Sequence, residues 1–341
     1  TPMVAYQVVG ESEVRSRLEV AVTRGLTPFV GRQELLSTLR AYWRQAQHGH
    51  GRVLLLSGEA GIGKSRLLQA LRVQIANEPH TWIECHCASS HQNSALYPAI
   101  DLLWRGLRFI RNEEPVRRLD KLERALAAYG FPLAEALPVF ATLLSLPIPE
   151  DRYSPLTVSP PRQRQRLLEL LQTWLLKAAA RRPVVGVVED LHWADPSTLE
   201  ALSLFLNHVP TQPILLVLTF RPEFQPPWPT APLLTHLRLD RLQREDAEAI
   251  ASHLMKERGD AQGLVQRIVT KADGVPLFVE ELTRTVMESF EARGSEEPHD
   301  SARFQSLPIP VTLQDSLRER LDRLGSAKRV AQLGAAIGRE F

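Results

Sequence analysis

The chain has 341 residues, enough for two or three domains, and its 41 basic and 39 acidic side chains leave a formal net charge of +2. This balance argues against a broad nucleic-acid surface, and the longest apolar runs, 184–188 and 214–220, are far too short to cross a bilayer. The two cysteines are too few for a disulfide scaffold, so a cytoplasmic location is predicted. The chain begins at Thr1 without a visible signal peptide, and we expect it to be a piece of a longer protein.

Four regions are expected along the chain. Residues 1–26 are predicted to be a linker from an upstream domain. Residues 27–243 carry the strand candidates of an α/β core, with a helical insertion at about 88–183. Residues 244–291 show helical patterns without strands and are expected to form a helical lid. Residues 292–341 are predicted to be a loop followed by the start of a winged-helix or other helical unit.

Apolar runs of strand length alternate with helical patterns in the core. The strand candidates, in chain order, are Val53–Ser57, Trp82–Cys87, Val184–Glu189, Ile214–Phe220 and Leu237–Leu239. This alternation predicts a parallel sheet with helices on both faces, the α/β architecture of a P-loop NTPase. The clearest helical patterns are at 116–129 and 163–180 in the insertion, and at 245–256, 261–272 and 276–290 in the lid.

A complete phosphate-binding loop follows the first strand candidate. The pattern G-x-x-x-x-G-K-[ST] is met by Gly58, Glu59, Ala60, Gly61, Ile62, Gly63, Lys64 and Ser65, with Arg66 next in the chain. Average residue usage produces this pattern by chance in about one in a hundred chains of this length. The alternative, a glycine-rich turn before an ordinary helix, gives Lys64 no reason to be there.

The physical chemistry of this loop predicts that the chain binds ATP. Its glycines allow successive backbone N–H groups to turn toward an anion, and the following helix adds the positive end of its dipole. Lys64 is expected at the β- and γ-phosphates, and the Ser65 hydroxyl is expected to bind Mg²⁺.

Two acids end the third strand candidate. Ligands of open α/β sheets lie outside the carboxyl ends of strands, so Glu189 and Asp190 are predicted to serve the nucleotide. We assign the metal role to Glu189 and orientation of the attacking water to Asp190, and the opposite assignment stays open. The alternative is a solvated acidic turn. Asp195, followed by a proline, is predicted to be a structural helix cap.

A basic residue follows the fourth strand candidate. The same rule directs Arg221 at the phosphates, where its guanidinium could stabilise the γ-phosphate. The alternative is an arginine at a strand end that forms a surface ion pair.

Two further clusters are given structural interpretations. The first contains Cys85, His86, Cys87 and His91. It lacks a second pair at zinc-site spacing, and alternate cysteines on one strand face are expected to be small buried residues. The second contains Arg162, Arg164 and Arg166. These are expected on the solvated face of an amphipathic helix, although contact of one of them with the nucleotide stays open.

The chain resembles the STAND branch of the AAA-type ATPases, the signal-transduction ATPases that include MalT-like regulators. The segments that carry the resemblance are Phe29–Arg32 with Glu34, the phosphate loop, Val187–Asp195, Thr219–Arg221 and Gly274–Pro276. The resemblance implies that Gly31, Arg32 and Pro276 approach the adenine and that Arg221 senses the γ-phosphate. Glu189 stands where many members have Asp, so slow hydrolysis is expected.

A narrower resemblance concerns the neighbouring domains. Tyr6–Ser12 and Arg24–Pro28 are similar to segments of bacterial proteins that carry a class III adenylate/guanylate cyclase domain upstream. In such proteins the ATPase module is followed by a winged-helix unit and tetratricopeptide-type repeats. The resemblance implies attached regulatory or effector domains as partners, and nucleotide-dependent assembly of several copies.

The sequence thus predicts a switch that binds ATP and Mg²⁺ and slowly hydrolyses ATP to ADP and phosphate. The nucleotide is expected between the core and the helical lid. One alternative is a scaffold that holds ADP without turnover. A second is a DNA-binding regulator of the MalT-like type, although no nucleic-acid or membrane partner is expected. A small-molecule kinase is disfavoured because no acceptor site is recognisable.

Overall fold

The computed structural model describes residues 25–149, 152–153, 159–228, 234–255 and 262–292, with Leu18, Ala21, Val22, Leu321, Lys328, Arg329 and Gln332 besides. The chain divides into two compact units. Unit 1 comprises Thr1–Gln33, Gly61–Ala70 and Asp240–Phe341, and unit 2 comprises Glu34–Ala60 and Leu71–Leu239. The division falls inside the phosphate loop, whose first three residues belong to unit 2 and whose remainder belongs to unit 1.

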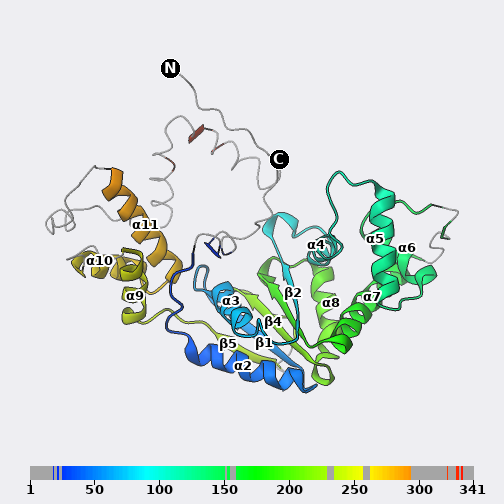
Figure 1. Cartoon of the computed structure of the whole chain (residues 1–341), viewed down its shortest axis with the longest axis horizontal. Helices are drawn as coiled ribbons and strands as arrows, with labels where there is room; N and C mark the ends of the chain where they lie inside the picture. Colours follow the sequence, from blue (N-terminus) through cyan, green and yellow to red (C-terminus); the bar gives the residue numbers. More distant parts are fainter. Residues whose placement is uncertain are drawn as a thin grey trace. The chain divides into compact units, whose positions relative to one another are not determined.

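Unit 2 is built on a five-stranded parallel sheet (Figure 1). Its strands are β1 (Arg52–Ser57), β2 (Thr81–His86), β3 (Val184–Glu189), β4 (Ile214–Phe220) and β5 (Leu234–Arg238). Their order in space is β2-β3-β4-β1-β5, and every neighbouring pair is parallel. The predicted parallel sheet is confirmed, with small differences at the ends of β1, β2 and β5. β4 separates β1 from β3.

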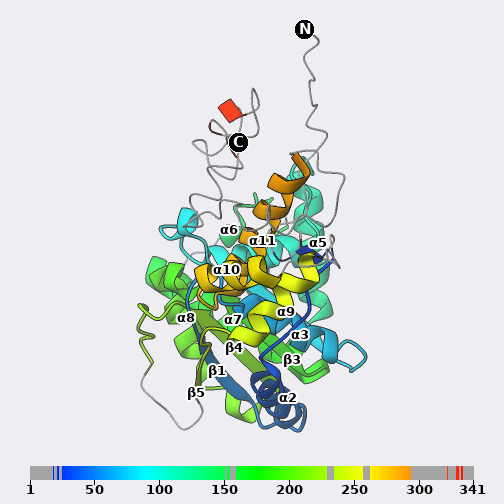
Figure 2. The ribbon, with the colours of Figure 1, turned by 90° about the vertical axis from the view of Figure 1, so that its left-hand side faces the viewer.

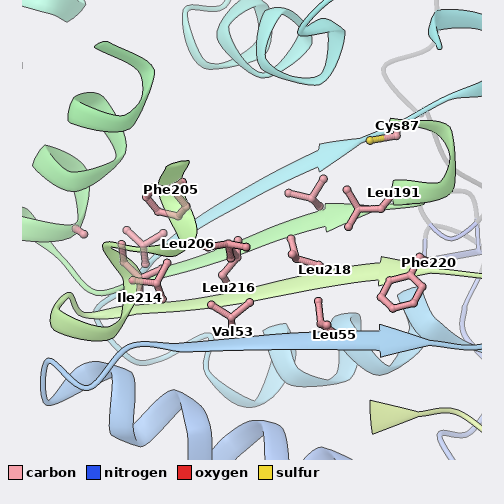
Figure 3. Packing of buried hydrophobic residues seen from close by; sticks show 14 of the residues in the cluster. Val53, Leu55, Cys87, Leu191, Phe205, Leu206, Ile214, Leu216, Leu218 and Phe220 are labelled. Carbon is pink, nitrogen blue, oxygen red and sulfur yellow. The ribbon is translucent and has the colours of Figure 1, made fainter. Parts of the chain in front are cut away.

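The central strands are buried on both faces because helices cover both. Alternate residues of β1 such as Val53 and Leu55 point into a cluster with Phe205 of α8 (Pro196–Leu206), shown in Figure 3. The intervening Leu54 is fully buried on the opposite face. Burial on both faces explains why β3 and β4 consist mostly of branched apolar residues.

A helix that precedes β1 is anchored to the β1–β5 side of the sheet. α2 (Gln33–Gln47) places Tyr42 so that its hydroxyl accepts a hydrogen bond from Thr235 of β5 at 3.3 Å. On the next turn, Gln45 accepts a hydrogen bond from Arg52 of β1 at 2.7 Å.

The described residues of the predicted helical insertion form four α-helices with a core of their own. They are α4 (Tyr97–Gly106), α5 (Pro115–Ala128), α6 (Leu133–Leu143) and α7 (Pro160–Arg181). Leu119, Leu122 and Leu126 share one face of α5 and are fully buried. They lie in one cluster with Phe140 of α6, whose ring meets Trp174 of α7 edge-on at 5.1 Å. The segment between β2 and β3 is therefore a helical subdomain rather than a long loop.

The described part of unit 1 after residue 240 is helical. It consists of α9 (Arg244–Met255), α10 (Gln262–Ala272) and α11 (Pro276–Ala292), which group together in Figure 2. Each contributes to one apolar cluster that includes Ile250, Ile268 and Leu282. The three helices predicted for the lid are thus present.

Several predictions lie outside the described residues. These are most of the linker at 1–26, the loop at 293–306 and nearly all of the winged-helix segment at 307–341. Among the helices that the structure describes, none is both long enough and apolar enough to span a membrane.

The predicted cap of α8 is confirmed. The Asp195 side chain accepts hydrogen bonds from the backbone N–H groups of Ser197 and Thr198 at 2.9 and 3.0 Å. The same carboxylate accepts from the Leu96 N–H at 3.2 Å, so Asp195 also joins the start of α4 to the start of α8. Its role is structural.

A partly exposed acidic group fixes α2 to the segment after α3 (Lys64–Gln74). Glu78 pairs with Arg40 and accepts hydrogen bonds from Trp43 at 2.7 Å and Gln47 at 3.0 Å. The Arg40 contact is the largest cause that lowers the pKa of Glu78 to about 2, against the opposing effect of burial. A lowered pKa means that the charged form stabilises the fold above the ordinary glutamate pKa and stops doing so as the pH falls toward 2.

Glu78→Gln is expected to lower the free energy of unfolding at pH 7 by about 1 kcal/mol. The difference from wild type should shrink between about pH 4.5 and pH 2, because the wild-type carboxylate is protonated there. Urea unfolding at several pH values measures both effects. The exposed Glu223 supplies the control, whose glutamine variant should change stability by less than about 0.5 kcal/mol. A deficit of Glu78→Gln that does not change with pH would contradict the assignment.

Candidate functional site

The phosphate loop leaves the sheet of unit 2 from a fixed position. Because all strands of a parallel sheet end at one edge, Gly58 after β1 and Glu189 at the end of β3 lie on the same side. The Gly58 N–H donates to the Phe220 carbonyl of β4 at 3.2 Å, and the Ser57 carbonyl accepts from the Leu239 N–H at 2.8 Å. Strands on both sides of β1 therefore hold the start of the loop.

The acidic pair is shaped by a turn that reverses the backbone. Glu189 is buried, with 6% of its surface exposed, whereas Asp190 adopts a left-handed conformation with φ 58°. The Asp190 N–H donates to the Thr219 hydroxyl of β4 at 3.1 Å, and Thr219 is fully buried. An aspartate tolerates the left-handed region better than most residues. The turn leaves the Asp190 carboxylate about half exposed at the sheet edge, where it can meet a ligand.

Thr219 is a residue whose role the sequence did not show. It lies in the segment that resembles the family's γ-phosphate sensor, where the role was assigned to Arg221, and its hydroxyl accepts the backbone N–H of Asp190. The structure therefore assigns Thr219 a positioning role.

Arg221 has an aromatic partner at this edge. Its guanidinium carbon lies 5.8 Å from the ring centroid of Trp193, in the short helix η2 (Leu191–Trp193) that follows the acidic pair. The His192 ring neighbours Trp193 at 5.0 Å, and its Nδ1 is 3.9 Å from Oδ1 of Asp190. These contacts place Arg221 beside the His-Trp segment. Its contact with the γ-phosphate stays a prediction.

Glu189 has two polar neighbours that the sequence did not identify. Glu84 and His86 of β2 lie beside it, and the ligand atoms of all three are within 4.8 Å of one another. Burial alone lowers the pKa of His86, but the hydrogen bond with Glu84 and the charge of Glu189 raise it above its ordinary value. No local motif signals this group, because Glu189 reaches it through the pairing of β3 with β2.

The two cysteines behave as the sequence analysis predicts. Cys87 is buried in the core beneath the sheet, and Cys85 packs against the same cluster. Burial raises the pKa of each thiol to about 12, so neither is a ready thiolate ligand. His91 stacks on Tyr97 at 3.6 Å.

The arginines at the start of α7 also have structural surroundings. Arg164 pairs with Glu200 of α8, and Arg166 pairs with Glu135 of α6. Arg162 is exposed. The solvated helix face predicted for them is consistent with these positions.

In unit 1, the second half of the phosphate loop has the backbone of an anion cradle. Gly61 and Gly63 have φ values of 75° and 101°, which favour glycine. Lys64 begins α3, and the Leu67 N–H donates to the Gly63 carbonyl at 3.0 Å as the helix starts. A Cβ at Gly63 would have no heavy atom within 4 Å, so this side of the loop is open. These features fit a bound phosphate chain.

The first turn of the lid helix α11 contacts the loop. The Leu277 N–H donates to the Gly61 carbonyl at 3.3 Å, and a Cβ at Gly61 would come within 2.8 Å of the Leu277 Cβ. α11 begins at Pro276, two residues after the left-handed Gly274. Gly274 is itself fixed, since its carbonyl accepts from the Leu242 N–H at 2.8 Å. The predicted G-x-P motif thus precedes the helix turn that bonds to the loop.

The segment that opens the core reaches the loop from another direction. Arg32 is buried, and its Nη2 donates to the carbonyls of Ile62 at 3.1 Å and Asp240 at 2.7 Å. Burial lowers the pKa of Arg32, although the charges of Asp240 and Asp246 counteract this. At Gly31, a Cβ would come within 2.3 Å of a carboxylate oxygen of Asp246. With a φ of 68°, any side chain at this position would also strain the backbone, so glycine is favoured.

Arg66 extends this network. Its Nη2 donates to the Thr27 carbonyl at 2.6 Å, and the Thr27 hydroxyl donates to Glu280 of α11 at 2.5 Å. Burial lowers the pKa of Arg66, with Glu280 opposing the shift. The opening segment, the start of α3 and α11 are joined by these three residues.

The chain is similar to a curated protein and to a solved structure. The chain is 28% identical over 323 residues to the uncharacterized protein R02095 of Rhizobium meliloti (strain 1021). That alignment covers 91% of this chain and 30% of the relative, so the chain spans less than a third of the relative's length. Among solved structures, it is similar to a chain of the Drosophila ORC bound to DNA, with 13% identity and a TM-score of 0.44. The similarity covers 97% of this chain and 72% of that one.

Residues 28–217 match the AAA ATPase domain family, and the match runs from the opening segment through the phosphate loop and the acidic pair into β4. It includes more than half of the 341 residues. This protein therefore belongs to the AAA ATPase domain family.

Proposed function

We propose that this chain is an ATP-dependent switch module that binds ATP with Mg²⁺ and hydrolyses it slowly. One observation carries the proposal: within unit 1, the carbonyl of Gly61 in the phosphate loop accepts a hydrogen bond from the first turn of lid helix α11. A ligand on the loop is therefore one peptide group away from the helix that would respond to it.

The coupling follows from the two sides of a peptide group. The Gly61 carbonyl belongs to the same peptide group as the Ile62 N–H, and the Ile62 carbonyl belongs to that of the Gly63 N–H. Both carbonyls are engaged, by Leu277 and by Arg32, respectively. When an N–H of such a group binds phosphate, its carbonyl becomes a better acceptor, because hydrogen bonds in a chain polarise one another. Phosphate binding would thus strengthen the contacts that hold α11 and the opening segment.

The residues of the site divide the chemistry among them. Lys64 would neutralise the β- and γ-phosphates, and Ser65 and Glu189 would hold the metal. When bound, Mg²⁺ supplies charge to the phosphate oxygens. Asp190, fixed through its backbone, would orient the attacking water, and Arg221 would stabilise charge on the γ-phosphate. The family supports nucleotide binding and ATPase chemistry, whereas these individual roles are part of the proposal.

The finer identity is also proposed. The His-Trp-Ala-Asp segment at 192–195 and the lid motif at 274–276 favour the STAND, MalT-like branch. We infer that the module passes its state to attached domains, a cyclase domain among them, in a longer cytoplasmic protein, and that nucleotide controls assembly of several copies.

A non-hydrolysing ADP-bound scaffold is the second candidate. It is favoured by the surroundings of Glu189, which is buried beside Glu84 and His86 rather than standing alone at the sheet edge. A carboxylate engaged in this way is less available to a catalytic metal. Tightly bound ADP in the purified protein, with no phosphate release, would identify this state.

Lys64→Ala is expected to weaken ATP binding at least tenfold and to abolish phosphate release, because the main positive charge at the phosphates is lost. Calorimetric titration with ATP and a phosphate-release assay measure the two effects. Lys177→Ala, a change at a half-buried lysine of α7 whose Nζ donates to the Gly130 carbonyl, is the control and should leave both unchanged. Normal ATP affinity in Lys64→Ala would refute the assignment of the loop.

Thr219→Val is expected to lower kcat about tenfold or more with little change in KM, because the Asp190 N–H loses its acceptor and the acid loses its position. Steady-state phosphate release measures both constants. Thr142→Val removes a hydroxyl that bonds within α6 and should leave kcat unchanged. Equal kcat values for the two variants would show that Thr219 does not position Asp190.

Gly61→Ala is expected to loosen the first turn of α11, because the added Cβ meets Leu277. Hydrogen exchange at the α11 amides should accelerate about tenfold or more. Gly63→Ala is the matched control: it introduces similar backbone strain into the same loop, but its Cβ meets nothing within 4 Å. If both variants left α11 equally protected, the loop and the lid helix would not be coupled through this contact.

A further inference from the structure

A three-residue cluster lies where β2 and β3 end. Glu84 and His86 are two residues apart on β2 and so point to the same face of the sheet. Glu189 of β3 is the register partner of His86. The Nε2 of His86 is 3.2 Å from Oε1 of Glu84, and one ligand atom from each residue lies within 4.8 Å of the other two. Two paired strands therefore hold two carboxylates and an imidazole together.

The orientation of Glu84 is fixed by its other oxygen. Its Oε2 accepts a hydrogen bond from the Trp82 indole at 2.8 Å and lies 3.7 Å from Arg72. These contacts leave Oε1 toward His86. Groups of this kind, which hold a ligand from behind, are typical of protein metal sites.

The neighbouring sulfur and imidazole groups do not belong to the cluster. Cys85 and Cys87 alternate with its residues along the strand and pack into the core. His91 is stacked on Tyr97. The donor set is therefore two carboxylates and one imidazole.

We propose that Glu84, His86 and Glu189 form a site for a divalent transition-metal ion of the Zn²⁺ class. Glutamate oxygens and a histidine nitrogen are both zinc ligand types, and three protein ligands leave a coordination position for water, as in catalytic zinc sites. The imidazole favours a transition metal over Mg²⁺ or Ca²⁺, which prefer oxygen ligands. The cation also offsets the repulsion between two carboxylates held close together.

The site has a consequence for the proposed ATPase and in this respect rests on the proposed function. Glu189 is shared by this site and by the proposed Mg²⁺ site of the nucleotide. A transition metal held by β2 and β3 would occupy the carboxylate that hydrolysis needs. Zn²⁺ is therefore expected to inhibit phosphate release and to favour the nucleotide-bound, non-hydrolysing state.

Metal binding is tested on the whole chain without nucleotide, so that its outcome is independent of ATPase activity. Calorimetric titration with Zn²⁺ alone should show one equivalent bound, and His86→Ala should weaken its binding at least tenfold. His91→Ala, a matched change at a neighbouring histidine, should bind as wild type does. Absence of Zn²⁺ binding by the wild type, or equal affinity in His86→Ala and wild type, would overturn the proposal.

Two further measurements show whether a loss of Zn²⁺ binding comes from misfolding and whether other residues bind the metal. Glu84→Gln keeps the size of the side chain. Without metal it should unfold at the same temperature as the wild type, and it should still bind Zn²⁺ more weakly. Titration with Co²⁺ should give visible absorption without a thiolate charge-transfer band in the near ultraviolet. A strong thiolate band would show that the cysteines bind the metal and would overturn the assignment.

Inhibition is measured separately. In the presence of Mg²⁺ and ATP, Zn²⁺ should reduce phosphate release by the wild type at least tenfold, and His86→Ala should need at least tenfold more Zn²⁺ for the same effect. If the chain releases no phosphate at all, the proposed ATPase fails while the Zn²⁺ titration still decides the metal site. Equal sensitivity of the two proteins would overturn the role of this site in inhibition.

Discussion

The peptide groups of the phosphate loop are the constraint on which unit 1 depends. Two consecutive carbonyls, those of Gly61 and Ile62, accept hydrogen bonds from the lid helix and from the buried Arg32. The N–H groups that complete these peptide units remain for an anion. The loop therefore presents N–H groups to a ligand on one side and bonds to α11 and Arg32 on the other. Its geometry cannot change without moving α11 or Arg32. The positive φ of Gly61, and the clash that an added Cβ would make with Leu277, disfavour any other residue at this position.

Unit 2 contributes a second constraint, the common edge at which parallel strands end. β4 lies between β1 and β3, so one strand supports both the start of the loop and the acidic turn. The Phe220 carbonyl accepts the Gly58 N–H, and the preceding Thr219 accepts the Asp190 N–H. Two adjacent residues of one strand thereby fix two parts of the proposed site. A packing change in β4 would disturb both at once.

The sequence predicted what depends on local pattern. The loop glycines, the buried strands and the Asp195 cap each have a signature within a few residues, and each is present. What it missed depends on register between distant segments. Thr219 meets Asp190 only because β4 pairs with β3, and His86 meets Glu189 only because β2 pairs with β3. Spacing along one chain does not encode which residues face each other across two strands.

Glu189 is where these constraints meet. Its place at the end of a buried strand suits a metal ligand of the nucleotide, and its register places it against His86 and Glu84. Burial penalises an isolated carboxylate, so a positive partner is required whenever Glu189 is charged. A protonated His86, a transition metal and the nucleotide's Mg²⁺ can each supply that charge, and their demands on the same oxygens conflict. Under the proposed function, the hydrolytic rate would therefore depend on which cation Glu189 faces, and the β2 residues beside it would set that choice.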